Sequence, residues 1–261
     1  MVSDTHSFEF YFFPSPNGLK VAIMLEECGL AYEVKPVDIG RGEQFRPEYL
    51  AINPNNKIPT IVDRDTGDAV FESGAILIYL AEKTGRFLSA ESAERMRTLC
   101  WLFWQVGGLG PMAGQAHHFR AFAEEEVPYA IRRYTDECNR LYGVMDRQLS
   151  DREYLAGDYS IADIACWPWI VPHERQGQDL AGFPNVQRWF EAIGARPGVR
   201  RGFALGHETQ MDREGYRFLY GQTAAMVNEQ ADRFSTNEPL SANDPPAANT
   251  KLPGNDTEPT A

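Results

Sequence analysis

The first third of the chain alternates between short apolar runs and helical patterns, and this order limits it to few folds. Residues 8–13 form an aromatic run that is ended by prolines, which predicts a buried strand. A helix is expected over residues 19–28, with Gly29 as its stop signal, and a second strand over residues 32–37. Two strands joined by a helix make one βαβ unit, whose strands pair in parallel.

The next segments add a short helix, a hairpin and a third helix. The short helix is expected over residues 47–52. Residues 57–63 and 69–71 are two apolar runs separated by a polar, glycine-containing turn, so they predict a hairpin. A helix follows over residues 73–83. The order β-α-β-α-β-β-α predicts a thioredoxin-like α/β domain over residues 1–86.

From residue 90 onward the pattern becomes helical, and we expect an all-α domain over residues 90–210. Helices are predicted over residues 93–106, 127–149, 164–170 and 184–195, with a capping box at 160–163 before the third. Residues 211–261 are expected to form a C-terminal extension. A helix is compatible with its part up to residue 234, whereas the rest is polar, proline-rich and too poor in apolar residues to fold alone.

Charge and hydropathy exclude several classes of partner. The net charge of −12 disfavours binding to nucleic acid or to an anionic membrane. No run approaches the roughly 18 apolar residues of a membrane helix, and the first residues do not resemble a signal peptide. We therefore expect a cytoplasmic protein.

The cysteines, histidines and tryptophans give no further site by themselves. The four cysteines have neither CxxC nor zinc spacing, so we expect buried or half-buried free thiols in a reducing compartment. His117 and His118 have no third ligand at a suitable spacing, so we expect surface-loop histidines and no metal. The aromatic residues at 101, 103, 104, 167 and 169 suggest an apolar substrate pocket, but helical spacing favours core positions.

Several motifs together resemble the cytosolic glutathione transferases over residues 8–206. They are the first βα turn at residues 14–18, a turn before a cis-proline at 53–59, a Glu-Ser step at 71–76 and the capping box at 160–163. Residues 15–18, 44–48 and 101–111 resemble the nu class of bacterial glutathione transferases more closely. That class often has Thr where this chain has Ser15, and the hydroxyl is kept. The resemblance implies a thioredoxin-like domain followed by an all-α domain, paired as a homodimer.

Ser15 and Asn17 lie where the first strand meets the first helix, and two roles are open to them. On spacing alone, capping of the helix is the better interpretation. The resemblance implies instead that both hydrogen-bond the sulfur of glutathione and, with the helix N-terminus, favour its thiolate. Because this turn holds no Cys-x-x-Cys, any working thiol would belong to bound glutathione.

The resemblance also implies the remaining glutathione-binding residues. A cis bond between Ile58 and Pro59 would present backbone groups to the cysteinyl unit, and the start of a helix at Glu72 and Ser73 would bind the γ-glutamyl arm. The resemblance further implies Gln44 and Lys57 for the backbone amides and the glycyl carboxylate of the ligand. Arg133, with Arg132 as its competitor, is implied for a second glutathione or for the ligand of a partner subunit. Taken singly, all of these are polar residues that are ordinarily solvated.

Three functions are compatible with these residues, and the resemblance to the nu class, which is associated with disulfide reduction by glutathione, favours the first. The first is glutathione-dependent thiol–disulfide exchange, in which the bound thiolate attacks a disulfide or a glutathionyl adduct of a small organic substrate and yields glutathione disulfide. The second is a transferase that conjugates electrophiles, or a lyase that cleaves a glutathione thioether of an aromatic substrate. The third is a non-catalytic binding protein, which we expect to lack the polar ligand residues that this chain keeps. Glutathione is a co-substrate in both enzymatic functions.

Overall fold

The computed structural model describes residues 7–206 and 222–235. The sheet-containing half comprises β1 (Phe8–Phe12), α1 (Pro16–Cys28), β2 (Tyr32–Pro36), η1 (Glu43–Phe45), α2 (Pro47–Leu50), β3 (Thr60–Asp63), β4 (Ala69–Phe71) and α3 (Ser73–Thr84). The helical half comprises α4 (Ser92–Trp104), η2 (Gln105–Leu109), α5 (Gly110–His117), η3 (His118–Phe122), α6 (Pro128–Gln148), α7 (Ile161–Ile170), η4 (Glu174–Gln176), η5 (Leu180–Gly182), α8 (Pro184–Gly194) and α9 (Pro197–Ala204). Helix α11 (Ala224–Ser235) follows.

The four strands form one mixed sheet in the order β2-β1-β3-β4. Strand β1 pairs in parallel with β2 and antiparallel with β3, while β3 and β4 pair as the expected antiparallel hairpin. Parallel pairing of β1 and β2 needs a crossover, which α1 supplies. The predicted thioredoxin-like order of elements is confirmed.

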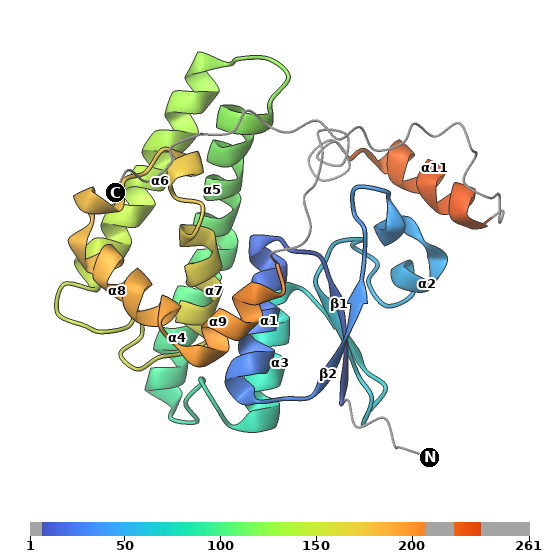
Figure 1. Cartoon of the computed structure of the whole chain (residues 1–261), viewed down its shortest axis with the longest axis horizontal. Coiled ribbons are helices and arrows are strands. Elements are labelled where there is room, and N and C mark those ends of the chain that lie inside the picture. The colour runs from blue at the N-terminus through green and yellow to red at the C-terminus, as the bar shows by residue number, and fades with distance from the viewer. Residues whose placement is uncertain (1–6, 207–221, 236–261) are drawn as a thin grey trace, which may run out of the picture.

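The two faces of the sheet are covered differently (Figure 1). Phe8, Phe10 and Phe12 alternate on the face that packs against α1 and α3, within the main apolar core. Phe13 lies in a smaller cluster on the α2 side, where Tyr49 is buried. Helices α1 and α3 are therefore held between the sheet and the helical half of the molecule, where α1 contacts α7 and α9.

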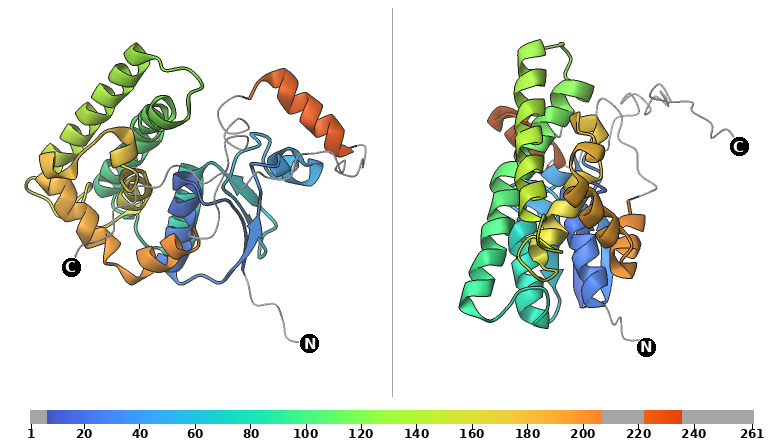
Figure 2. Two further views of the ribbon diagram at one scale, coloured as in Figure 1. Left: turned by 45° about the horizontal axis from the view of Figure 1, so that its top comes forward. Right: turned by 90° about the vertical axis from the view of Figure 1, so that its left-hand side faces the viewer.

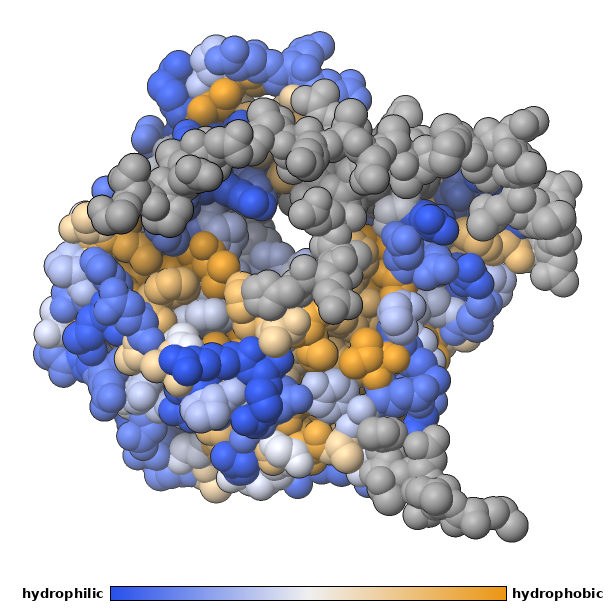
Figure 3. All heavy atoms as spheres, viewed as in Figure 1, coloured by the Kyte–Doolittle hydropathy of each residue, from blue (hydrophilic) through white to orange (hydrophobic). Residues whose placement is uncertain are grey.

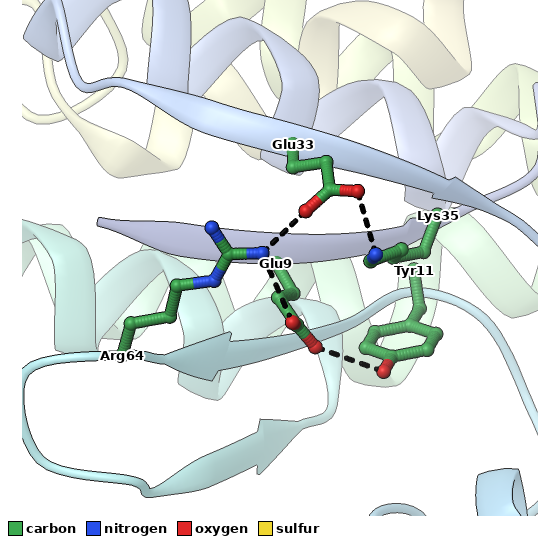
Figure 4. Close-up of polar contacts among 5 residues, drawn as sticks. All are labelled: Glu9, Tyr11, Glu33, Lys35 and Arg64. Carbon is green, nitrogen blue, oxygen red and sulfur yellow. Dashed lines mark hydrogen bonds and ion pairs between the residues drawn. The ribbon is translucent and has the colours of Figure 1, made fainter. Parts of the chain in front are cut away.

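Side chains of β1 and β2 meet the side chain of Arg64, which directly follows β3 (Figure 4). Arg64 forms ion pairs with Glu9 and Glu33, and Lys35 pairs with Glu33 at 2.6 Å. The Tyr11 hydroxyl donates to Glu9 at 3.0 Å, and burial together with this carboxylate raises the pKa of Tyr11 to about 12. These residues pair with one another across the strands, and none of them lines the cavity between the two halves of the molecule.

The helical half is built around α7, which is apolar and almost fully buried. Ser160 caps it, and the buried Asp163 carboxylate accepts from the Ser160 backbone, as the capping-box motif predicts. Helix α4 continues without a break through the π-helical turn η2 into α5, and α6 packs alongside α5 (Figures 1 and 2). Among the described residues, no helix is long and apolar enough to cross a membrane.

The last described helix returns to the sheet-containing half. Helix α11 contacts η1 and α2, and Arg46 lies over the ring of Phe234 at 5.5 Å (Figure 1). The sequence was compatible with a helix up to residue 234, and in the described part of this extension a helix spans Ala224–Ser235. The proline-rich part after residue 235 lies outside the described residues.

Some sequence expectations are wrong in detail. The third strand begins at Thr60 and not at residue 57, so the Ile58–Pro59 bond lies before it. His117 ends α5 and His118 begins η3, so both are helical and half-buried and do not lie in a surface loop. The helix reaches them because it continues through the glycines of η2 and α5. Cys100 is exposed, and Phe103 is 64% exposed, so neither belongs to the core.

Candidate functional site

A cavity of about 410 Å³ lies between the sheet-containing half and the helical half. The space-filling view shows an opening between these two parts (Figure 3). The start of α1, the loop before β3 and the start of α3 line one side, and η2, α5 and α7 line the other. Eight of the nine predicted site residues line it, namely Ser15, Asn17, Gln44, Lys57, Ile58, Pro59, Glu72 and Ser73.

The start of α1 brings two polar side chains to the cavity. Ser15 is the N-cap, and its Oγ accepts a hydrogen bond from the Gly18 N–H at 3.1 Å. Since the oxygen accepts in this bond, the hydroxyl proton remains a donor for a ligand. A Cβ atom on Gly18 would lie 2.3 Å from the Phe13 carbonyl oxygen, so only glycine allows the helix to begin this close to β1.

A contact from the other half of the molecule fixes the Asn17 amide. The Trp169 Nε1 donates to Asn17 Oδ1 at 3.0 Å. An indole N–H is only a donor, so the oxygen of the amide must face it and the NH2 group must face away. Ser15 and Asn17 thus present two hydrogen-bond donors at the positive end of α1, an arrangement that stabilises an anion.

The loop before β3 is held by hydrogen bonds to its backbone. The Ile58–Pro59 bond is cis, as predicted. Tyr49 Oη and Asn53 Nδ2 both donate to the Lys57 carbonyl, at 2.7 and 2.5 Å. These contacts fix the loop at the edge of the cavity, so its backbone can pair with an extended ligand as a strand would.

The start of α3 combines an unusual backbone with a buried hydroxyl. Glu72 has φ 69°, a left-handed conformation that is strained for a non-glycine residue, and such strain is concentrated at functional sites. Its side chain accepts from Asn55 Nδ2 at 3.2 Å. Ser73, the first residue of the helix, is only 8% exposed and lies in the cavity wall, where the N-terminus favours a carboxylate.

Gln44 and Lys57 complete this side of the cavity. Gln44 is 1% exposed; its Nε2 donates to the Ile39 carbonyl, while its Oε1 is buried with no hydrogen-bond partner among the described residues. Such an acceptor is costly unless a ligand N–H satisfies it. Burial lowers the pKa of Lys57, and its ammonium is one of the cations that line the cavity.

Arg133 is the predicted residue that does not line the cavity of this chain. It lies on α6 with its side chain 53% exposed, and it pairs with Glu137 at 3.8 Å. Arg132 is also exposed. Their predicted part in a second glutathione site stays a prediction.

Among the other lining residues are Lys20, Asn56, Gln105, Trp169 and Gln222, none of which the sequence analysis predicted as a site residue. Lys20 had a signal in the sequence, because it interrupts an otherwise apolar helix face, and Trp169 is one of the aromatic residues that suggested a pocket. Asn56, Gln105 and Gln222 reach the cavity through tertiary packing. Gln222 comes from beyond the helical half and accepts from Asn56 Nδ2 at 3.1 Å, which no local pattern indicates.

Among the described residues, the site contains neither a cysteine thiol nor a cluster of metal-ligating side chains. All four cysteines lie in the described part of the chain, and none of them lines the cavity. Within the described residues there is also no group of three or more His, Cys, Asp or Glu side chains that could hold a metal ion. The groups that could act on a ligand here are hydroxyls, amides, ammoniums and one carboxylate.

Comparison with known proteins agrees with this geometry. Residues 14–83 match the N-terminal domain family of glutathione S-transferases, and residues 110–197 match the C-terminal domain family. The chain is 56% identical over 197 residues to the disulfide-bond oxidoreductase YfcG of Escherichia coli, covering 73% of this chain and 92% of that protein.

Two solved structures are similar in both sequence and fold. A glutathione transferase family member from Pseudomonas fluorescens, with two glutathione bound, is 45% identical with a TM-score of 0.72, covering 77% of this chain and 94% of that one. A glutathione transferase from Pseudomonas putida, with one glutathione disulfide bound per subunit, is 44% identical with a TM-score of 0.72, covering 78% and 93%. With both of its domains matched and its fold shared with these structures, the chain belongs to the glutathione transferase family.

Proposed function

We propose that this protein is a glutathione-dependent disulfide-bond oxidoreductase that uses the thiol of bound glutathione. The observation that carries the proposal is the pair of donors at the start of α1. Ser15 and Asn17 both line the cavity, and no cysteine does. The similarity to an oxidoreductase of Escherichia coli and to a structure that holds glutathione disulfide supports the same function.

The reaction is an exchange between two sulfur centres. The Ser15 hydroxyl and the Asn17 NH2 hydrogen-bond the glutathione sulfur and favour its thiolate. This thiolate attacks the glutathionyl sulfur of a mixed disulfide between glutathione and a small organic thiol. The new S–S bond makes glutathione disulfide, and the organic thiolate leaves with the electron pair of the broken bond and takes a proton from water. A symmetric disulfide reacts in two such steps.

The other lining residues bind the glutathione that supplies the thiolate. The start of α3 at Ser73 takes the γ-glutamyl carboxylate, and the Glu72 carboxylate accepts from the ammonium of that arm. The backbone at Ile58 pairs with the cysteinyl unit. Gln44 Oε1, which is buried without a partner among the described residues, accepts an amide N–H of the ligand, and Lys57 pairs with the glycyl carboxylate.

A direct assay separates this function from ordinary conjugation. Glutathione and 2-hydroxyethyl disulfide are supplied, and formation of glutathione disulfide is followed beside conjugation of chlorodinitrobenzene. We expect disulfide turnover that falls at least about tenfold in Asn17→Ala, whereas Asn139→Ala, an exposed amide on α6, has no effect. Brisk conjugation without disulfide turnover would instead assign a conventional transferase.

A second variant tests whose thiol reacts. Replacing all four cysteines together leaves the cavity lining intact, because none of them contributes to it. We expect this variant to keep its disulfide turnover. Loss of turnover in a variant that still melts cooperatively would contradict the use of the glutathione thiol alone.

We also propose that the protein is a homodimer. Met96, Cys100 and Phe103 recur at helical spacing on α4, and all three are exposed, Met96 at 60% and Phe103 at 64%. An exposed apolar stripe of this kind is typical of a surface that another chain covers. Light scattering after gel filtration tests this proposal: we expect a dimer for the unmodified chain and a monomer for Phe103→Glu, with Tyr129→Glu as a control for an exposed aromatic residue elsewhere.

A further inference from the structure

The Lys20 side chain is fully buried in the wall of the cavity. It lies on α1 among core residues and is 1% exposed. Its Nζ donates to Gln105 Oε1 at 2.6 Å and to Ser73 Oγ at 3.3 Å. It therefore links the start of α3, where the proposed γ-glutamyl site lies, to η2 in the helical half of the molecule.

Both hydrogen-bond partners of this ammonium are neutral. A buried lysine is ordinarily paired with a carboxylate, because burial of an unpaired charge is costly. Glu72, before α3, favours the charged form but forms no described hydrogen bond with Nζ. The Cys166 thiol, on α7, adds no negative charge near neutral pH, because burial raises its pKa well above the ordinary value. An anionic ligand in the cavity would supply the missing negative charge.

Gln105 has a second group that lacks a partner. Its side chain is buried, and its Nε2 has no hydrogen-bond partner among the described residues. This nitrogen packs against Gly110, where a Cβ atom would lie 2.9 Å away. The cavity wall thus holds a buried ammonium without a hydrogen-bonded carboxylate and, beside it, a buried amide N–H group without an acceptor among the described residues.

We propose that Lys20 is a positioning residue that holds Ser73 and Gln105 and takes up a proton when an anionic glutathionyl ligand enters the cavity. This inference rests on the proposed function, in that it takes the ligand to be glutathione or a derivative. Lys20 acts through the two residues that it contacts. It orients the Ser73 hydroxyl, and its charge compensates the carboxylate that binds there.

The protonation state of Lys20 supports this role. Burial lowers its pKa to about 7, while Cys166 and Glu72 act in the opposite direction. The other elements packed against it contribute the neutral groups Ser73 and Gln105, and Lys57 is the second cation in the cavity lining. A bound carboxylate favours the charged form and raises the pKa of Lys20. At pH 8, therefore, a neutral Lys20 must become protonated as the ligand binds.

Proton uptake of this kind makes binding depend on pH. Between pH 6 and pH 8 the free protein loses the Lys20 proton, whereas the complex keeps it. We expect the affinity for the ligand to fall about tenfold over this interval, because each pH unit above the free pKa weakens binding tenfold. We therefore expect KM for glutathione to rise with pH. Because higher pH also favours the glutathione thiolate, we expect that kcat does not fall.

The experiment uses S-methylglutathione, whose sulfur cannot release a proton. Calorimetry at pH 8 in phosphate and in Tris, which differ in ionisation enthalpy, gives the number of protons taken up. We expect uptake of about 1 proton for the unmodified protein and none for Lys20→Met, which replaces the ammonium by an apolar chain of similar length. Lys35→Met, which removes a lysine on β2 outside the cavity (Figure 4), is expected to keep the uptake.

The possible outcomes separate this proposal from the proposed function. Uptake that persists in Lys20→Met, or affinity of the unmodified protein that is equal at pH 6 and pH 8, overturns the role of Lys20 alone. The second comparison needs no variant, so it holds even if Lys20→Met does not fold. Failure to bind S-methylglutathione at any pH overturns the glutathione site itself, and the role of Lys20 with it.

Discussion

Trp169 on α7 donates its indole N–H to Asn17 Oδ1 on the first turn of α1, at 3.0 Å. The two residues come from different halves of the molecule and are 152 positions apart in the sequence. The helical half therefore decides which way the Asn17 amide faces, and with it the direction of the donor that we propose for the glutathione sulfur.

Replacing Trp169 by Phe tests this relationship. The variant keeps an aromatic ring against Gly110 and Gly114 but loses the N–H, so the Asn17 amide can turn. We expect kcat for disulfide turnover to fall roughly 3- to 10-fold, the equivalent of one hydrogen bond, with a smaller change in KM. Steady-state kinetics with 2-hydroxyethyl disulfide measure both constants.

The chain offers a matched control on the same helix. Trp167 also donates its indole N–H, in this case to the Phe190 carbonyl at 2.9 Å, and it does not line the cavity. We expect Trp167→Phe to lower stability and to leave kcat unchanged. Equal losses of kcat in the two variants would show that α7 packing, and not the bond to Asn17, governs turnover.

Gly202 allows α9 to lie directly on α1. A Cβ atom at this position would be 2.6 Å from the Ile23 nitrogen and 2.7 Å from its Cα, and backbone atoms cannot rotate away. We expect Gly202→Ala to lower the free energy of unfolding by about 1–3 kcal/mol. Denaturant unfolding measures this loss. Gly182→Ala, where a Cβ meets nothing within 4 Å, is the control and is expected to change stability by less than about 0.5 kcal/mol.

Helix α11 is expected to support ligand binding from outside the two matched domains. Phe234 stacks on Arg46, and Gln222, just before this helix, lines the cavity beside Asn56. Loss of one cation–π contact is worth about 0.5–1 kcal/mol. We therefore expect Phe234→Ala to weaken glutathione binding roughly 2- to 5-fold by calorimetry. Asp232→Ala, at an exposed position on the same helix, is the control and is expected to bind glutathione as the unmodified protein does. Equal affinity of the unmodified protein and both variants would contradict a role for α11.

The parts of the fold that local rules determine could be predicted from the sequence. Prolines after the first aromatic run, Gly29 at a helix end and the Ser160 capping box each satisfy a backbone requirement within a few residues. Alternating burial of β1 follows from side chains that point to opposite faces of a strand. The resemblance predicted eight residues that all line one cavity in the structure, and their roles stay predictions.

Long-range packing explains what could not be predicted. Cys100 and Phe103 lie on a helix whose spacing favours burial, yet their face of α4 is exposed in the single chain. The indole of Trp169 belongs to the cavity because α7 crosses the start of α1. Gln222 arrives from a segment that no motif marked, so nothing near it in sequence indicates its contact with Asn56.

The acid stability of the protein is expected to depend on His117, at the end of α5. Its Nε2 is buried without a hydrogen-bond partner among the described residues, and its ring lies 4.8 Å from that of Phe122. Burial, with smaller effects from Arg175 and His118, lowers the pKa of His117 to about 4. In the unfolded chain a histidine has a pKa near 6.5.

The sign of the effect follows from which state binds more protons. Between pH 6.5 and about pH 4 the unfolded chain is protonated at His117 and the folded chain is not, so acid favours unfolding. We expect the free energy of unfolding to fall across this interval, and to fall less steeply in His117→Phe, which keeps an aromatic ring beside Phe122. Urea unfolding at half-unit steps of pH measures both slopes. Parallel slopes in the two proteins would mean that other groups cause the acid sensitivity, and that the buried His117 ring is as easily protonated in the folded state as in the unfolded one.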